Sequence, residues 1–207
     1  MNAQNYQKLM DSELSMDGAK EKTLLLHACC APCSSHCLTY LEEKIKIKVY
    51  YYNPNIVEFN EHEKRAAELE RLVKTLNIEY PNALMEILET DYDPKPFLEI
   101  AKGLEHEPEG GRRCEKCFEL RLRAAAKKAK EEKADYFTTT LTISPLKNAA
   151  LINEIGEKIA IEEGIKWLPS DFKKKEGYKH SVELSKKYDL YRQNYCGCKY
   201  SKRGKES

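Results

Sequence analysis

The 207-residue chain has little of what marks fibrous, disordered or membrane proteins. Its 9 glycines and 8 prolines follow no repeat, which excludes collagen-like and low-complexity chains. Its best apolar run, around residues 24–26, is far shorter than the roughly 18 apolar residues that indicate a membrane-spanning helix. Residues 1–22 carry several acidic side chains and no apolar stretch of the kind found in a secretory signal peptide. We therefore expect a cytoplasmic protein without a membrane partner.

The chain also lacks a strong charge of either sign and the common nucleotide-binding fingerprints. Thirty-five basic residues almost balance 34 acidic ones, and the formal net charge is +1. A nucleic-acid partner would therefore have to be held by a local basic patch. The sequence contains no GxGxxG fingerprint for a flavin or nicotinamide cofactor and no ATP-binding loop.

The pattern of apolar residues predicts strands and helices that alternate along the chain. We expect strands at residues 23–28, 46–52, 84–88, 135–140 and 165–168. We expect helices at residues 32–44, 62–76, 95–102, 114–130, 147–163 and 176–188. Such alternation is typical of an α/β fold in which a parallel sheet of about five strands carries helices on both faces. The length favours a single domain, so we divide the chain into a polar lead-in (1–22), one α/β catalytic domain with a metal site (23–198) and a basic tail (199–207).

Cysteine is the unusual residue of this chain. Eight cysteines occur, at positions 29, 30, 33, 37, 114, 117, 196 and 198. Without an export signal, clustered cysteines favour metal or redox chemistry over structural disulfides. Adjacent cysteines can reach different irons of a polynuclear cluster but suit a single tetrahedral zinc less well. Four thiolates from the first cluster and the CxxC pair would satisfy a [4Fe–4S] cluster, while structural zinc and a thiol redox pair remain open.

Three cysteines have separate interpretations. Cys196 and Cys198 form a CxC pair, which can close a strained, redox-labile disulfide or supply two further metal ligands. Cys37 lies well inside a predicted helix, and we expect it to be a buried small hydrophobe.

The unusual segments share one place in the predicted fold. Residues 29–33, 53–55, 138–145 and 169–171 each follow a predicted strand. In an open α/β sheet, ligands bind outside the carboxyl ends of the strands. We therefore expect these four segments to meet at one functional edge.

Six segments together resemble the QueH-type epoxyqueuosine reductase family. They are HACCAPC (27–33), YNPN (52–55), RRCEKC (112–117), TTLTISPLKN (139–148), SDFKKKEGY (170–178) and YRQNYCGC (191–198). The resemblance spans about residues 24–198 and implies an iron–sulfur oxidoreductase that acts on tRNA. Such an enzyme would reduce epoxyqueuosine at the wobble position to queuosine, which is the last step of queuosine synthesis.

The resemblance also implies roles for particular residues. The cluster ligands would be Cys29, Cys30, Cys114 and Cys117, and Cys196 with Cys198 would form a redox-active disulfide. The sheet would be similar to that of adenine nucleotide α-hydrolase-like proteins. The phosphate-binding loop of those proteins is replaced here by cysteines, which argues against ATP use.

The expected chemistry leaves some residues to be assigned. Converting an epoxide to an alkene and water needs two electrons, two protons and help for a departing oxygen. A CxC dithiol can store the electrons that a cluster passes singly. Cys33 is then spare, and our hypothesis gives it, with Asp171, to an additional mononuclear iron. Asp171 and Lys173 are candidates for an acid or a metal ligand, or are ordinary solvated loop charges.

The prediction of an RNA-binding surface rests on the last quarter of the chain, where lysines, arginines and tyrosines are interleaved. Phosphate contacts combined with aromatic stacking are how single-stranded RNA is usually held. The candidate tRNA contacts are Arg112, Arg113, Lys173, Tyr191 and Arg192. An ordinary solvated lysine-rich surface is the other interpretation of this region.

Two further functions remain open from the residues alone. A zinc-binding RNA-interaction module without catalysis would use the cysteines as scaffold. A thiol–disulfide oxidoreductase would use the CxxC and CxC pairs without metal. The leading hypothesis also requires an external electron donor, which the sequence does not identify.

Overall fold

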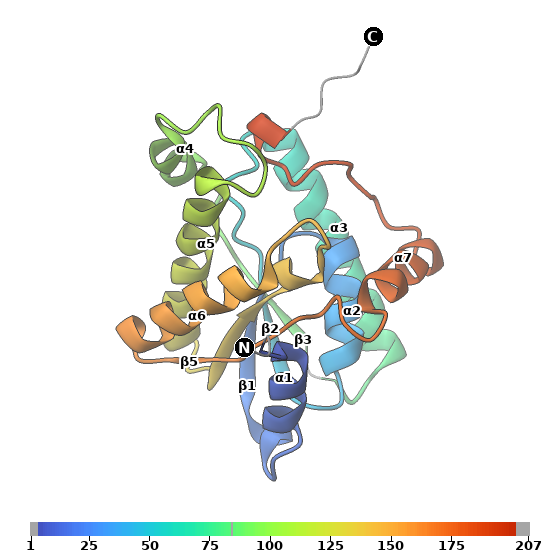
Figure 1. The fold of residues 1–207 in the computed structure, drawn as a ribbon. Helices are drawn as coiled ribbons and strands as arrows, with labels where there is room; N and C mark the ends of the chain where they lie inside the picture. The colour runs from blue at the N-terminus through green and yellow to red at the C-terminus, as the bar shows by residue number, and fades with distance from the viewer. Residues whose placement is uncertain (1–3, 84, 202–207) are drawn as a thin grey trace.

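Five parallel strands form one sheet in the computed structural model, which describes residues 4–83 and 85–201. The strand order is β3-β2-β1-β4-β5 (Figure 1). The strands are β1 (Thr23–His27), β2 (Lys46–Tyr50), β3 (Met85–Leu88), β4 (Tyr136–Thr139) and β5 (Lys166–Trp167). The predicted α/β class and parallel sheet are therefore confirmed. The predicted third strand began one residue earlier, at Leu84, which lies outside the described residues.

The helices fall close to the predicted segments. They are α1 (Tyr6–Leu14), α2 (Ala31–Leu41), α3 (Phe59–Glu79), α4 (Lys95–Ala101), α5 (Arg112–Glu131), α6 (Ala149–Glu163) and α7 (Gly177–Lys187). The short 3-10 helices are η1 (Ala19–Glu21), η2 (Thr140–Ile143) and η3 (Lys199–Ser201). Within the described ranges, none of the helices has the length and apolarity needed to cross a bilayer.

Both faces of the sheet are covered, which is why the middle of its central strand, residues 24–26, is continuously apolar. Leu24 and Leu26 of β1 pack with residues of α1, α2, α3 and α7, whereas Leu25 packs with residues of α5 and α6. Figure 1 shows α5 and α6 on one side of the sheet and α2, α3 and α7 on the other. Successive side chains of a strand point to opposite faces, so a strand buried on both faces has no polar alternation.

The strand order places a topological switch point between β1 and β4. These two strands pair in parallel, with His27 opposite Thr139 at their carboxyl ends. The chain leaves β1 into α2 on one face and, by way of η2, leaves β4 into α6 on the other face. Connections that diverge in this way open a crevice at the carboxyl edge, where α/β folds bind their ligands.

The N-terminal lead-in is part of the packed structure. Met10 of α1 is fully buried and, with Leu14, joins the core beneath α2. The Asp11 carboxylate accepts hydrogen bonds from the Tyr40 hydroxyl and, at 2.6 Å, from Lys175 Nζ. The lead-in therefore ties α2 to the loop that precedes α7.

This packing predicts that Met10→Ala lowers the free energy of unfolding by about 2–5 kcal/mol, the usual cost of truncating a buried large side chain. Leu9→Ala, at a neighbouring position that is 37% exposed, should have a much smaller effect. Urea denaturation followed by circular dichroism measures both variants. Equal effects would show that α1 does not contribute to the core as described.

Candidate metal and redox site

The first cysteine group lies directly after β1. The Sγ atoms of Cys29, Cys30 and Cys33 all lie within 4.8 Å of one another. Cys30 is the N-cap of α2, and Pro32 stands in its first turn, where the fixed φ of proline suits a helix. The helix therefore starts at once, and its first turn brings Cys33 back beside the two cysteines that precede it.

These three thiols differ in pKa. Hydrogen bonds from the Cys30 and Cys33 thiols, together with the Arg121 and Lys147 charges, hold the pKa of Cys29 well below its ordinary value. The same contacts and burial raise the pKa of Cys30 to about 12 and raise that of Cys33 well above its usual range. Cys29 is therefore the thiol of this group that ionises first.

Polar side chains from neighbouring strand ends hold Cys29 in place. Its backbone N–H donates to Thr140 Oγ1 at 3.1 Å, and the Thr140 hydroxyl donates to its Sγ at 3.3 Å. Asn53, in the loop after β2, donates from Nδ2 to the Ala28 carbonyl at 2.9 Å. The conformation of the cysteine loop is therefore set from both sides of β1.

The second cysteine group combines two distant segments. Cys114 and Cys117 stand in the first two turns of α5, and Cys196 and Cys198 come from the C-terminal segment; all four line one cavity of about 120 Å³. Asn55 Nδ2 donates to the Cys196 carbonyl at 3.2 Å. The loop after β2 thus positions the CxC pair as well as Cys29.

Gly197 is required for the shape of the CxC pair. Its φ is +99°, a conformation that side chains with a Cβ rarely adopt. A Cβ there would also lie 2.6 Å from Cγ1 of Ile56, whose backbone pairs with Cys198 in an isolated bridge. The glycine therefore lets the two cysteines fold back against the Asn55–Ile56 segment.

The CxC thiols are also electrostatically distinct. A hydrogen bond from the Cys198 thiol, supported by Ser201 Oγ 3.0 Å away and by the Lys147 charge, holds the pKa of Cys196 well below its ordinary value. The same pairing and burial raise the pKa of Cys198 far above its usual range. Cys196 is therefore the thiol of this pair that ionises first.

The two cysteine groups adjoin. The first group lines a cavity of about 270 Å³, called here the first cavity, and the second group lines the second cavity described above. Both cavities are lined by Glu109, Arg121, Leu146, Lys147 and Cys196. Two cations and one redox-capable thiol therefore stand between the two groups.

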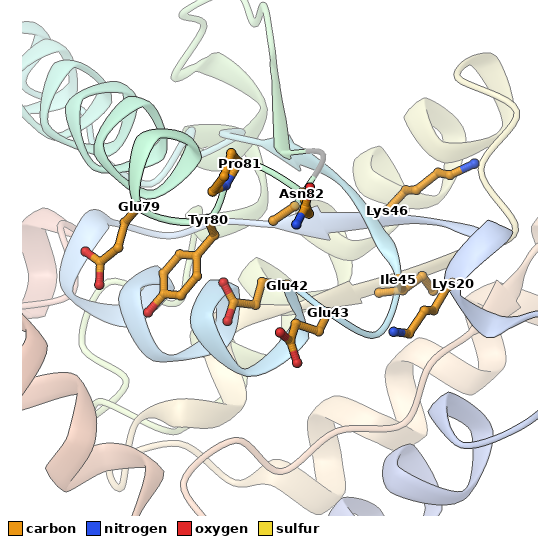
Figure 2. A pocket seen from close by; sticks show the side chains of 10 residues that line it. Lys20, Glu42, Glu43, Ile45, Lys46, Glu79, Tyr80, Pro81 and Asn82 are labelled. Atoms are coloured by element: carbon orange, nitrogen blue, oxygen red, sulfur yellow. The ribbon is translucent and has the colours of Figure 1, made fainter.

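A larger hollow of about 570 Å³ lies at the opposite edge of the sheet. Figure 2 shows its lining of two glutamates that follow α2, and one at the end of α3, together with Lys20, Lys46 and Tyr80. It lies beside the start of β2, away from the carboxyl ends of the strands. Its lining contains acidic and basic side chains but no cysteine, so size alone does not identify the functional site.

The amino-acid sequence matches one family of known proteins. A family model described as "Epoxyqueuosine reductase QueH" matches residues 24–204. The chain belongs to the QueH family. It is 44% identical over 202 residues to the epoxyqueuosine reductase QueH of Staphylococcus epidermidis, covering 95% of this chain and 84% of that protein. It is 35% identical over 182 residues to the QueH of Thermotoga maritima, covering 86% of this chain and 90% of that protein. The resemblance recognised in the six segments is thus confirmed.

The donors at the QueH-type site fit a metal or an iron–sulfur centre. All eight cysteines are free thiols, and each lies within the described part of the chain. Three sulfurs converge in the first cavity, and two cations beside them can balance the charge of thiolates. Thiolate is the preferred ligand of iron–sulfur clusters and a common ligand of zinc.

The four predicted cluster ligands lie in two adjoining groups. Cys33, rather than Cys114 or Cys117, lies within 4.8 Å of both Cys29 and Cys30. Cys114 and Cys117 line the adjoining second cavity. Cys37 is fully buried in the core, as predicted.

Asp171 follows β5 as predicted, and its side chain is only 10% exposed. Its carboxylate forms an ion pair with Lys173 Nζ at 2.9 Å. Among the described residues, neither Asp171 nor Lys173 belongs to the lining of the first or second cavity. The pair is largely buried beside Phe172, so these residues are not solvated loop charges either.

The candidate tRNA contacts differ in accessibility. Arg192 is exposed and lines the first cavity, and Arg112 is also exposed. Arg113 is only 1% exposed, and its Nη1 donates to the carbonyls of Leu104, Glu105 and Glu107. Arg113 is therefore corrected from a phosphate contact to a residue that fastens the loop before α5.

Tyr191, another candidate tRNA contact, is held against α3. The Tyr191 hydroxyl donates to Glu61 at 3.1 Å, and Lys64 Nζ lies 3.5 Å from its ring centroid. These contacts bind the C-terminal segment to α3 and leave the ring only partly available for stacking. The basic residues of the tail beyond residue 201 lie outside the described residues.

Arg121 and Lys147 line both cavities, although the sequence pattern did not single them out. Arg121 had one available signal, because it stands four residues after Cys117 and therefore on the same face of α5. Lys147 stands in the TTLTISPLKN segment. Its Nζ makes no hydrogen bond or ion pair with any residue that the structure describes. Although burial lowers the pKa of Lys147, the thiols of Cys29, Cys33 and Cys196 raise it overall.

The pKa directions predict the order in which thiols react in reduced, metal-free protein. Thiolate is the nucleophile, so at pH 7 iodoacetamide should alkylate Cys29 and Cys196 several-fold faster than Cys30 and Cys198. Peptide mass spectrometry at timed intervals measures each site, and urea-denatured protein provides the control in which these differences disappear. Earlier modification of Cys30 or Cys198 would contradict the described pKa directions.

Proposed function

We propose that this protein reduces epoxyqueuosine in tRNA to queuosine, the last step of queuosine synthesis, and that it uses an iron–sulfur centre. One observation carries the proposal: a converging group of three thiols adjoins a CxC dithiol at the switch point of a parallel sheet. Family membership supports the same activity, because the curated relatives are epoxyqueuosine reductases.

Oxidation of the CxC dithiol supplies the electrons and protons that epoxide reduction consumes. Both C–O bonds of the epoxide break, a carbon–carbon double bond forms, and the oxygen leaves as water, which consumes two electrons and two protons. Oxidation of the Cys196 and Cys198 thiols to a disulfide releases two electrons and two protons. One dithiol therefore supplies one turnover, and an external electron donor must then reduce the disulfide.

The cysteine groups together would hold the metal centre. A [4Fe–4S] cluster would be held by Cys29 and Cys30 from the first cavity and by Cys114 and Cys117 from the second. When bound, it supplies the one-electron transfer that a dithiol lacks. Cys33 is then the candidate ligand for an additional mononuclear iron. Asp171 is left out of this proposal because its ion pair with Lys173 lies outside both cavities.

Lys147 would assist the departing oxygen. Its ammonium group lines the cavity that contains Cys29, Cys33 and Cys196. A cation placed where negative charge develops stabilises that charge most effectively when little water intervenes. We therefore assign Lys147 to donate a hydrogen bond to the oxygen as the C–O bonds break.

The first cavity would also receive the modified base. Tyr178, Tyr195 and Arg192 line it and supply aromatic surface and positive charge at its mouth. Single-stranded RNA is held by such stacking and phosphate contacts. A wobble base lies in a loop, so presenting it to the cavity does not require a duplex to open.

The proposed cofactor predicts that anaerobically purified protein is brown, with about four irons and four sulfides per chain. Iron beyond four would support the mononuclear site. Cys29→Ala should lose most of the iron because it removes a ligand, whereas Cys37→Ala, at a core position, should retain it. Cys196→Ser should also retain the iron but should not turn over epoxyqueuosine-containing tRNA.

Other outcomes of this measurement would favour the alternative functions. Colourless protein with one zinc per chain would support a zinc-binding RNA-interaction module. Metal-free protein that catalyses disulfide exchange would support a thiol–disulfide oxidoreductase. Either result, after anaerobic reconstitution has also failed, would overturn the iron–sulfur proposal.

The proposed tRNA contact predicts that Arg192→Glu weakens tRNA binding and makes the affinity less dependent on salt, because a phosphate contact releases counterions. Lys158→Glu makes the same charge change on α6, where Lys158 is exposed and does not line the first cavity. Filter binding at several salt concentrations measures both variants. Equal slopes for Arg192→Glu and the unmodified protein would remove Arg192 from the tRNA interface.

A further inference from the structure

Arg121 carries a buried positive charge between the two cysteine groups. Its side chain is 3% exposed and lines both cavities. Within residues 4–83 and 85–201, no carboxylate forms an ion pair with its guanidinium. Arg65 is also buried, but its charge is neutralised by the Glu61 carboxylate, which lies 2.6 Å from its Nη2.

The hydrogen-bond partners of Arg121 carry no negative charge. Its Nη2 donates to Asn53 Oδ1, and its Nε lies 3.4 Å from His27 Nε2. An imidazole is either neutral or cationic, so His27 supplies no compensating negative charge. Neither partner cancels the charge of the guanidinium.

The same partners connect Arg121 to the cysteine loop. Asn53 donates to the Ala28 carbonyl, one residue before Cys29. His27 Nδ1 lies 2.8 Å from Thr139 Oγ1, at the end of β4. Arg121 therefore joins α5, which carries Cys114 and Cys117, to the ends of β1, β2 and β4.

A buried charge is costly unless an opposite charge compensates it. The cavities that Arg121 lines are also lined by thiols, Cys29 in the first and Cys117 in the second, and a thiol becomes anionic when it loses its proton or binds a metal. Glu109 lines both cavities as well, but it is exposed at their rim. The environment of Arg121 thus favours an anionic centre in the cavities.

We propose that Arg121 is the positioning residue of this site: its neutral hydrogen bonds align the two cysteine groups, and its uncancelled charge balances the thiolate-bound centre they hold. The inference rests on the proposed function, because the centre in question is the iron–sulfur centre. It adds a residue whose effect is electrostatic and structural, without contact with the reacting atoms.

The charge has a measurable consequence. Removing a nearby buried cation leaves a thiolate-bound centre more negative, so adding an electron becomes harder and its reduction potential falls. Weaker compensation should also speed the loss of iron to a chelator by several-fold. A purely structural role would lower stability without shifting the potential of the centre in protein that remains folded.

The test compares Arg121→Gln with Arg123→Gln in anaerobically reconstituted protein. Arg123 stands two residues later on α5 and pairs at the surface with Glu119, Glu162 and Glu163. We expect Arg121→Gln to show a more negative potential in a dye-coupled redox titration and faster iron loss. Arg123→Gln should match the unmodified protein in both measurements.

Two substitutions at Asn53 separate charge from hydrogen bonding and serve also if Arg121→Gln fails to fold. Asn53→Asp places a carboxylate against the guanidinium and cancels its charge, so the potential should fall. Asn53→Ala removes the hydrogen bonds but keeps the charge, so any fall should be smaller. An unchanged potential in folded Arg121→Gln, or in Asn53→Asp, would overturn the inference.

The failure of this inference is distinguishable from failure of the proposed function. If the unmodified protein binds no iron after reconstitution, the proposed function fails. The positioning role can then be measured in metal-free protein by hydrogen exchange. Arg121→Gln should speed exchange of the Cys29 amide, which is bonded to Thr140, and Arg123→Gln should not. Equal exchange in the two variants would overturn the positioning role too.

Discussion

The parallel pairing of β1 with β4 is the constraint on which the site depends. Their register places His27 opposite Thr139, so both strands end at the same level. The cysteine loop and η2 then begin side by side, and Thr140 can bond both the amide and the sulfur of Cys29. A slip in this register would separate these atoms, because each residue advances a strand by about 3.3 Å.

The neighbouring strand extends the same arrangement to the CxC pair. β2 lies beside β1, and the Asn53–Pro54–Asn55 turn after it contacts both cysteine segments. Asn53 bonds the carbonyl before Cys29, and Asn55 bonds the carbonyl of Cys196. One short turn therefore sets the separation between the first cysteine group and the redox pair, which are 163 or more residues apart in sequence.

The buried cations of the protein show how specialised this edge is. Arg65 is neutralised by Glu61, and Arg113 is satisfied on one nitrogen by three backbone carbonyls. Arg121, which is buried, and Lys147, which is half-buried, have neither solution and instead line a cavity together with thiols. Such uncompensated charges are expensive in a folded protein without ligand, and perturbed groups of this kind concentrate where ligands are bound.

Much of the fold was predictable because local patterns determine it. Each strand and helix has its own apolar run or helical spacing, and clustered cysteines are informative at any position. The functional edge followed from the rule that the carboxyl ends of parallel strands meet. The family followed from six short segments in order.

The remaining features depend on tertiary contacts that spacing does not encode. Arg112 and Arg113 are adjacent in sequence, yet one is exposed and the other buried, because they stand on different faces of the first turn of α5. Asp171 follows a strand as expected, but its 2.9 Å ion pair with Lys173 could not be inferred from its position after that strand. The partnership of Arg121 with His27 spans 94 residues, and only the packing of α5 on the sheet brings them together.

The division of the cysteines into two adjoining groups has a chemical reason under the proposed reaction. Epoxide reduction consumes electrons in a pair, whereas an iron–sulfur centre exchanges them singly. The dithiol must therefore lie close to the centre and still be free to form its own disulfide. Cys196 meets both conditions, because it lines both cavities while Gly197 and the Asn55–Ile56 segment hold it against Cys198. The glycine conformation and the turn after β2 thus matter as much to the chemistry as the sulfurs do.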